Sequence, residues 1–405
     1  MLTYLEARDK IRSMVKQLPT ERIPLAQALN RILAYPIFAD RDYPPFNRAA
    51  MDGVAIRMED WNNGIREFRI RTTIFAGMET PTTIATGECY KIMTGAACPI
   101  PADTIIRKED LTFTPNGTAL IRRESISRGQ HLAQRGEDLK KNELAVTAPR
   151  VCDISLIGTL AALGIHQAPV YKMPTIGIVT TGNEVVDIQQ QPEHFQIRNS
   201  NQHLLRALCE QWQLPIRSCQ HVSDEPKALS AALKQATQQQ LILINGGVSA
   251  GDADHVPQIL RELGVEILFH KVSIKPGKPL LVGFLPEGKI IFALPGNPLS
   301  CFMTFKLFVE DYLHGCLGFT NERFQTSTLT IPRFKKSSLD EFFPVFRHAG
   351  EYGYTWKPHH GSGDITATVG CDGIGWHVHN KHVIAENDSI PVLSLHPFFN
   401  IIKPY

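Results

Sequence analysis

The chain has 405 residues, is 43% hydrophobic and 20% charged, and carries a formal net charge of +2; it is too long for one core, so about two to four domains are expected. The nearly balanced charge excludes the basic footprint of a nucleic-acid-binding protein, and no run of about 18 apolar residues occurs that could span a membrane. Eight cysteines without a CxxC pair, behind an N-terminus that lacks a secretory hydrophobic segment, indicate a reducing, cytoplasmic setting.

The first part of the chain is predicted to be helical. Thr3 and Glu6 have the spacing of a capping box, and a second short helix is predicted over residues 24–33. Helical character returns at residues 152–165. We therefore expect residues 1–43 and 144–170 to pack together as one discontinuous N-terminal domain.

Between these two segments the residue pattern changes from helical to strand-like. Short alternating runs, such as residues 68–74 and 104–107, are separated by turn signals at Pro81, Gly87 and Pro115. This pattern predicts a small, mostly β domain, inserted over residues 44–143.

Residues 171–322 alternate between strand and helix patterns. Buried-strand signals at residues 175–180 and 241–244 are followed by turns and then by amphipathic segments. Such alternation predicts a central parallel sheet covered by helices on both faces, with ligands at the carboxyl ends of its strands.

Residues 323–405 are again strand-like and are predicted to form a C-terminal β domain. Within it, residues 374–378 and 382–385 resemble a hairpin around Asn380 and Lys381. The predicted fold class is thus multidomain α/β plus β.

The glycine-rich turn after residues 241–244 is the first candidate site. A strand, a glycine turn and a helix together direct backbone N–H groups at an anion such as phosphate. The turn also contains Asp252 and Asp254, whose carboxylates suit a phosphate if a divalent cation lies between them. The alternative is that both residues only cap the following helix.

Three further loops follow strands of the same predicted sheet. They contain Glu184, the pair Lys275 and Lys278, and the LPGNP segment that precedes Ser300. Two lysines can hold a small oxyanion or a phosphate, while Glu184 with the two aspartates could bind Mg²⁺. The sequence has no recognisable serine–histidine–acid arrangement, and the glycine turn lacks the GK[ST] of a P-loop.

Five histidines gather near the end of the chain, and three of them could meet in the predicted hairpin. We interpret them as surface residues rather than a metal site, because no acid or thiol partner accompanies them. The residues are His359, His360, His377, His379 and His382.

The order of motifs along the chain resembles the MoeA family of molybdopterin molybdenumtransferases, which also includes the E domain of gephyrin. Nearly the whole chain takes part in the resemblance. The motifs are AAMDGVAIR (49–57), KIMTGAACPIPADTIIRKED (91–110), QRGEDLKK (134–141), TTGNEV (180–185), NSN (199–201), GGVSAGDAD (246–254), KPGKP (275–279) and LPGNPLS (294–300).

This resemblance implies an elongated homodimer in which the α/β part of one subunit and the inserted β domain of the other share a site. It implies Mg²⁺-dependent insertion of molybdate into the dithiolene of adenylylated molybdopterin, with release of AMP. The implied partners are a molybdopterin adenylyltransferase and the molybdoenzymes that accept the cofactor, but neither nucleic acid nor membrane.

The resemblance also implies roles for individual residues. The implied catalytic residues are Glu184, Asp224 and Asp254, with Asp52, Thr94 and Asp138 from the second subunit. The implied substrate-binding residues are Gly246, Gly247, Ser249, Gly251, Lys275, Lys278, Pro295, Pro298 and Ser300, with Arg347 and Ser362 from the C-terminal part. The implied metal ligands are Glu184, Asp252 and Asp254.

The chain departs from the family pattern at two positions. Asn183 stands where the family usually has aspartate, and Val54 where it usually has an aromatic residue. Loss of the carboxylate at 183 implies weaker metal binding, and a divergent paralogue without insertase activity is the alternative function. Two further readings are the related adenylyltransferase, disfavoured by the inserted domain, and a peptide-binding scaffold, disfavoured by the acids and lysines in the loops.

Overall fold

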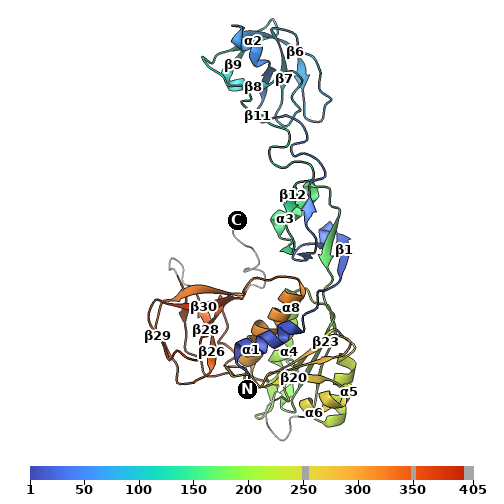
Figure 1. The fold of residues 1–405 in the computed structure, drawn as a ribbon, viewed down its shortest axis with the longest axis vertical. Helices are drawn as coiled ribbons and strands as arrows, with labels where there is room; N and C mark the ends of the chain where they lie inside the picture. Colours follow the sequence, from blue (N-terminus) through green and yellow to red (C-terminus); the bar gives the residue numbers. More distant parts are fainter. Residues whose placement is uncertain (249–254, 348–352, 396–405) are drawn as a thin grey trace. The chain divides into compact units, whose positions relative to one another are not determined.

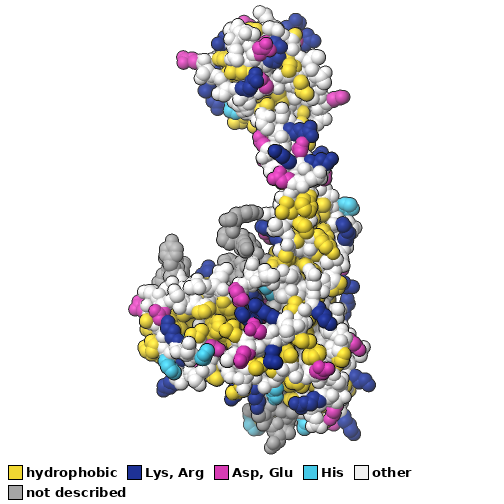
Figure 2. Space-filling view, viewed as in Figure 1, with side chains coloured by type: hydrophobic (Ala, Val, Ile, Leu, Met, Phe, Trp, Pro, Cys, Tyr) yellow, Lys and Arg dark blue, Asp and Glu magenta, His cyan; other side chains and the backbone are white. Residues whose placement is uncertain are grey.

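A computed structural model describes residues 1–248, 255–347 and 353–395 (Figure 1). The chain forms two compact units: residues 36–148 with 161–164, and residues 1–35, 149–160 and 165–405. Acidic and basic side chains are interspersed on the visible face of each unit (Figure 2). No helix within the described residues is long and apolar enough to cross a bilayer.

The smaller unit is built on a six-stranded sheet, which confirms the mostly β character predicted for this part of the chain. Apolar residues lie on both faces of the sheet, with Ile74 and Ile105 in one cluster and Phe68 and Ile106 in the other. A short helix, α2 (Met58–Asn62), and two-residue pairings of β4 (Arg48–Ala49) with β11 (Leu132–Ala133) and β3 (Ile37–Phe38) with β12 (Leu144–Val146) complete it. The sheet order is β8 (Thr104–Arg107), β5 (Gly53–Ile56), β7 (Glu88–Ile92), β6 (Glu67–Ile74), β10 (Thr118–Ile121) and β9 (Leu111–Phe113).

The N-terminal helix α1 (Tyr4–Ser13) begins at the predicted capping box. The Glu6 N–H donates to the Thr3 hydroxyl at 3.3 Å, and the Thr3 N–H donates to the Glu6 carboxylate at 2.8 Å. These two bonds satisfy backbone donors that the first helical turn leaves free.

The short helix predicted over residues 24–33 is wrong. Residues 20–24 form strand β1 (Thr20–Pro24), only Leu25–Gln27 makes a 3₁₀ turn, and β2 (Ile32–Leu33) follows. These residues join a four-stranded sheet with the order β1–β14–β2–β13. Its other two strands are β13 (Arg150–Val151) and β14 (Gln167–Tyr171), which precede and follow α3 (Ile154–Ala162) in the sequence. Pro24 fits because β1 is an edge strand, where a missing N–H costs no ladder bond.

The α/β part contains a six-stranded sheet with strands in both directions. Its order is β18 (Ile216–Val222), β15 (Ile176–Thr181), β19 (Leu241–Asn245), β23 (Lys289–Leu294), β22 (Leu281–Leu285) and β20 (Glu266–His270). The first four strands are parallel, but β22 is antiparallel to both β23 and β20. The predicted parallel sheet is therefore found in four strands, whereas β22 is antiparallel because a tight turn at Gly288 joins it directly to β23.

Helices cover both faces of this sheet, as predicted. Leu229 and Leu260 pack with Val179 on one face, from α5 (Pro226–Ala236) and α6 (Val256–Glu262). Leu205 and Phe308 pack with Ile178 on the other. Their elements are α4 (Ser200–Gln211) and the continuous helix formed by α7 (Pro298–Thr304), the π-helical segment η3 (Phe305–Val309) and α8 (Glu310–Cys316).

The C-terminal part forms another six-stranded sheet, which includes a strand from the α/β part. Its order is β21 (Ile274–Lys275), β26 (Asp340–Phe346), β28 (Gly373–His377), β30 (Asp388–Ser394) and β24 (Phe324–Leu329), with β27 (Thr355–Trp356) paired to β26. Through β21, residue Lys275 is hydrogen-bonded into the sheet of the C-terminal part.

The hairpin predicted around Asn380 and Lys381 is wrong. Strand β28 pairs with β26 and β30, whereas β29 (Val383–Ile384) pairs with β25 (Arg333–Phe334). A Cβ added to Gly375 would lie 2.7 Å from the Phe343 ring, so glycine leaves room for this ring across the β26–β28 pair. This long-range packing overrides the local turn signal.

Candidate active site at the carboxyl edge of the α/β sheet

Five loops meet at one edge of the α/β sheet. Strands β15, β18, β19 and β23 are parallel and in register, and they all end there. Strand β20 runs in the direction of β23, because both are antiparallel to β22, so the β20–β22 connection with its two lysines lies at the same edge. The convergence predicted for four of these loops is therefore found even though the sheet is mixed.

The turn after β19 requires glycine at two successive positions. Gly246 and Gly247 have φ values of +98° and +65°, in the left-handed region. A Cβ at Gly246 would lie 2.6 Å from the Thr181 carbonyl oxygen, and a Cβ at Gly247 would lie 2.8 Å from a Val256 methyl group. The backbone of the turn thus packs directly against the neighbouring loop. The predicted residues Ser249, Gly251, Asp252 and Asp254 lie outside the described residues.

Asp224 and the loop that contains Glu184 are linked by three hydrogen bonds. The Asp224 carboxylate accepts from the Thr181 hydroxyl at 2.6 Å and from the Asn183 N–H at 3.1 Å. In return, the Asn183 side-chain oxygen accepts from the Asp224 N–H at 3.1 Å. Glu184 itself is exposed to solvent. Asn183, at the position where the sequence departs from the family, therefore ties two loops of the site together.

Two buried asparagines fix the LPGNP segment, and residue-by-residue reasoning missed one of them. Asn201 donates to the Asn245 side-chain oxygen at 2.9 Å and to the Gly296 carbonyl at 2.6 Å. Asn245 donates to the Pro295 carbonyl at 2.8 Å. Asn201 belongs to the NSN motif, whereas the only sequence signal for Asn245 is a polar residue that ends an otherwise apolar strand.

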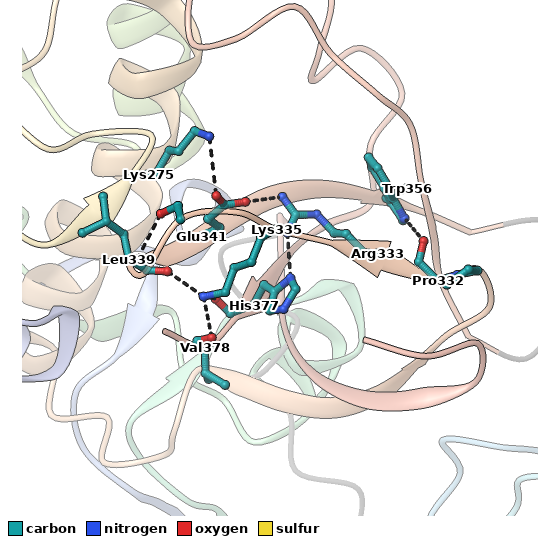
Figure 3. Close-up of polar contacts among 10 residues, drawn as sticks. Lys275, Pro332, Arg333, Lys335, Leu339, Glu341, Trp356, His377 and Val378 are labelled. Atoms are coloured by element: carbon teal, nitrogen blue, oxygen red, sulfur yellow. Dashed lines mark hydrogen bonds and ion pairs between the residues drawn. The ribbon is translucent and has the colours of Figure 1, made fainter. Parts of the chain in front are cut away.

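Lys275, the first lysine of the KPGKP segment, lines a pocket of about 600 Å³. The Lys275 side chain is 63% exposed, and its Nζ lies 3.5 Å from a Glu341 carboxylate oxygen. Lys278 is also exposed. Figure 3 shows how Lys275 and Glu341 face each other. The pocket is lined by Lys275, Pro276, Arg333, Phe334, Lys335, Lys336, Ser337, Glu341, Phe342, Trp356, Pro358, His359 and Gly361.

The start of α7 contacts a loop of the C-terminal part. The Asn297 amide donates to the Ser362 hydroxyl at 2.7 Å, and the Leu299 N–H donates to the Ser362 carbonyl at 3.1 Å. Pro298 is the first helical residue, and Ser300 in the same turn is only 3% exposed. The structure therefore brings Ser362 to the LPGNP segment, but it buries the residue whose hydroxyl was predicted to contact an oxyanion.

Arg347 is not part of this group. It follows the last residue of β26, six residues beyond Glu341 and thus about 20 Å along the strand. Its guanidinium donates to the Tyr354 hydroxyl at 2.7 Å, and its N–H donates to Asp372. The guanidinium that lines the pocket belongs to Arg333, whose only sequence signal is the basic PRFKK segment.

In the smaller unit, Asp52 and Thr94 lie in contact. The Asp52 carboxylate accepts from the Thr94 N–H and from its hydroxyl, both at 2.8 Å, and Lys108 Nζ lies 3.7 Å away. These contacts, the Thr94 N–H first, hold the pKa of Asp52 below its ordinary value. Asp138 is exposed in a separate loop, where its N–H donates to the Tyr43 carbonyl.

Within the described part of the chain, no three histidine, cysteine or acidic side chains are grouped so that they could hold a metal ion. Of the three predicted metal ligands, only Glu184 is described. The interpretation of the C-terminal histidines as surface residues is wrong for His377, which is fully buried. Its Nδ1 accepts from the Arg333 guanidinium at 2.8 Å.

Comparison with known proteins covers most of the chain. Residues 2–164 match a family model described as "MoeA N-terminal region (domain I and II)", and residues 177–315 match one described as "Probable molybdopterin binding domain". Over 328 residues the chain is 35% identical to a molybdopterin molybdenumtransferase of Synechococcus elongatus, spanning 78% of this chain and 81% of that protein. A Staphylococcus aureus protein of the same name is 33% identical over 344 residues, spanning 84% and 79%.

Solved structures show the same architecture. A molybdopterin biosynthesis MoeA protein from Pyrococcus horikosii superposes with a TM-score of 0.81 at 28% identity, covering 97% of this chain and 99% of the other. A molybdenum cofactor biosynthesis protein from Pyrococcus furiosus gives a TM-score of 0.60 at 19% identity with the same coverage, and supports the fold alone.

Proposed function

Because the chain belongs to the family of molybdopterin molybdenumtransferases, we propose that it inserts molybdenum from molybdate into molybdopterin during molybdenum cofactor biosynthesis. The observation that carries the proposal is the convergence of five loops at the carboxyl edge of the α/β sheet. This edge is where α/β proteins generally bind their ligands. It combines exposed lysines, glycine turns and acidic side chains, as a reaction between anions requires.

Lys275 and Lys278 are the residues that we assign to molybdate. Molybdate is a tetrahedral dianion, and two exposed ammonium groups on one short loop supply both charge and hydrogen-bond donors. The Ser362 hydroxyl, held by Asn297 beside the start of α7, supplies a neutral donor from the C-terminal part. In this assignment Ser300 and Arg347 have structural roles, because one is buried and the other lies away from the loop.

We assign the glycine turn to the phosphate end of the substrate. Glycine at both positions lets the turn pack against Thr181 and Val256. The Gly246 N–H already donates to the Leu294 carbonyl at 3.3 Å, so the Gly247 N–H is the one that we assign to the phosphate. The substrate in this proposal is adenylylated molybdopterin, and AMP is released when its phosphoanhydride bond is cleaved. Mg²⁺ would offset the charge of that bond when bound by hard carboxylate oxygens, for which we assign Glu184, Asp252 and Asp254.

Asp224 has a different role in this proposal. Both of its carboxylate oxygens already accept hydrogen bonds from the loop after β15. We therefore assign Asp224 and Asn183 to positioning Glu184, rather than to direct metal binding.

The proposal includes a second copy of the chain. In it, Asp52, Thr94 and Asp138 of the inserted β domain complete the site of the other subunit. Asp52 suits such a role because two hydrogen bonds from Thr94 hold its carboxylate in place. A molybdopterin adenylyltransferase would supply the substrate, and molybdoenzymes would accept the product.

The decisive experiment is anaerobic single-turnover AMP release from adenylylated molybdopterin, with and without molybdate and Mg²⁺, followed by reconstitution of a cofactor-free molybdoenzyme. We expect AMP release that depends on molybdate and yields active enzyme. K275M should raise the molybdate concentration required, whereas K289M, at the opposite edge of the sheet, should not. Tight substrate binding without AMP release would contradict the proposal and favour a divergent paralogue.

A mixed-subunit experiment tests the contribution of the second copy. D52A and E184A are each expected to be inactive alone. Co-expressed, they should recover about a quarter of wild-type activity, because half of the randomly assembled dimers contain one intact site of two. Recovery of none would show that both residues act within one subunit.

A further inference from the structure

We propose that Glu341 is a positioning residue for Lys275, and that a buried chain of contacts from His377 through Arg333 to Glu341 directs the Lys275 ammonium group toward the oxyanion. This inference rests on the proposed function for the identity of the anion. It assigns to the C-terminal β part a role in the site of the α/β part. Figure 3 shows the four side chains.

The backbone places Lys275 and Glu341 opposite each other. Strands β21 and β26 are parallel neighbours, and Lys275 is in register with Glu341. Lys275 Nζ lies 3.5 Å from one Glu341 oxygen, while the lysine side chain remains 63% exposed. A lysine side chain has four rotatable bonds and loses much conformational freedom when it binds a ligand. A carboxylate that restricts it beforehand reduces this loss.

Glu341 is itself held rigidly. Its second oxygen accepts from the Arg333 guanidinium at 2.7 Å, and both side chains are less than a tenth exposed. Arg333 donates in turn to His377 Nδ1 at 2.8 Å. The guanidinium lies over the Phe343 ring at 4.2 Å and near the Trp356 ring at 5.4 Å, so aromatic packing fixes its plane.

The protonation states agree with this geometry. Burial, and then the nearby Arg333, lower the pKa of His377 to about 4, so its Nδ1 is free to accept at neutral pH. Burial acts to raise the pKa of Glu341, but the hydrogen bond and charge of Arg333 outweigh it, and the pKa lies below its ordinary value. Glu341 is therefore ionised beside Lys275.

The contacts from His377 through Arg333 to Glu341 orient the Lys275 side chain but add no net charge. The opposite charges of Arg333 and Glu341 cancel at short range, so the positive charge of Lys275 remains available to a dianion. Two other roles are possible for the same contacts. The pair could only stabilise the C-terminal sheet, or Glu341 could compete with the anion for Lys275.

A double-mutant cycle separates these roles. R333M/E341L removes one charge of each sign and replaces a buried ion pair by apolar side chains, a change that folds often tolerate. The dissociation constant of molybdate is measured by equilibrium dialysis on the full chain for wild type, R333M/E341L, K275M and the combined variant. E287Q/K289Q removes a charge-neutral pair at the β22–β23 turn and serves as the control.

We expect R333M/E341L to raise the dissociation constant about five- to ten-fold, the scale of an ordered side chain, and K275M to raise it at least as much. The combined variant should bind no more weakly than K275M, because the pair acts through Lys275. The control should bind as wild type does, and thermal unfolding should confirm that every variant is folded.

Three outcomes would overturn the inference. Additive losses in the combined variant would show that the pair does not act through Lys275. Unchanged binding in R333M/E341L would leave the pair a purely structural role, and tighter binding would identify Glu341 as a competitor. Sulfate is measured in parallel, so that the two proposals can fail separately. Wild type could bind sulfate but not molybdate, with the variants showing the same non-additive losses toward sulfate. In that case the positioning role of Glu341 stands and the proposed function fails.

Discussion

Removal of the Glu310 carboxylate is predicted to destabilise the larger unit strongly. Glu310 is fully buried and accepts from Lys306 at 2.7 Å, from Arg323 at 2.5 Å and from the Trp212 indole at 2.9 Å. Lys306 also donates to the carbonyl of Leu395, at the end of the C-terminal sheet. One carboxylate therefore organises contacts between the long α7–α8 helix, α4 and the C-terminal part.

The size of the effect follows from what E310A leaves behind. Lys306 and Arg323 each lose their ion pair with Glu310, and breaking a buried ion pair by removing one partner costs about 3–5 kcal/mol. The indole N–H loses its acceptor as well, which costs about 1 kcal/mol or more. For a unit of this size, the sum corresponds to a fall of about 10 °C in Tm.

Thermal and urea unfolding, followed by circular dichroism and tryptophan fluorescence, would measure this loss. E322A is the matched control: the Glu322 side chain is 60% exposed and pairs with Arg8 and Arg12. The control should cost less than about 1 kcal/mol, because exposed ion pairs are weak. The triple change K306M/E310L/R323M should recover much of the lost stability. Equal effects of E310A and E322A would refute the reasoning.

Three further predictions concern single side chains. G246A should abolish AMP release while the fold survives, because its Cβ would lie 2.6 Å from the Thr181 carbonyl oxygen at a φ of +98°; wild-type turnover would contradict the tight packing of this turn. His314 has its pKa lowered from 6.5 to about 3, by burial first, so its neutral form contributes stability that is complete above pH 6.5 and decreases as the pH falls toward 3. H314F should flatten this decrease in a series of urea midpoints, and an unchanged slope would contradict the assignment. T94V removes the Thr94 hydroxyl, one of the two donors that lower the pKa of Asp52. A carboxyl-selective NMR titration should therefore show the Asp52 pKa moving up toward its ordinary value. A downward move would refute the electrostatic argument.

Local sequence signals predicted those elements whose stabilising contacts are themselves local. The capping box of Thr3 and Glu6 begins α1 as expected, since both hydrogen bonds join residues three positions apart. The apolar run that became β19 was recognisable because both faces of that strand are covered by helices. The order of the family motifs predicted the fold class and located the loops of the site in the α/β part.

Predictions failed where distant segments compete for the same residues. Residues 32–33 joined β13 and β14 rather than a helix, and residues 373–377 joined β26 and β30 rather than the nearby β29. In each case the observed strand pairs with segments that are distant in sequence, and these pairings replace the local helix or turn. A pattern of periods and turn residues contains no information about which distant strand is available.

The sequence by itself determined which residue types could serve an anion at the sheet edge, because lysines, acids and glycines were placed directly after buried strands. Only the tertiary structure decided how they are held. It placed Arg333 rather than Arg347 at the pocket, tied Asn183 to Asp224, and set Glu341 opposite Lys275. These contacts join residues from about 40 to more than 60 positions apart, and their partners are selected by sheet register and packing, which no local pattern encodes.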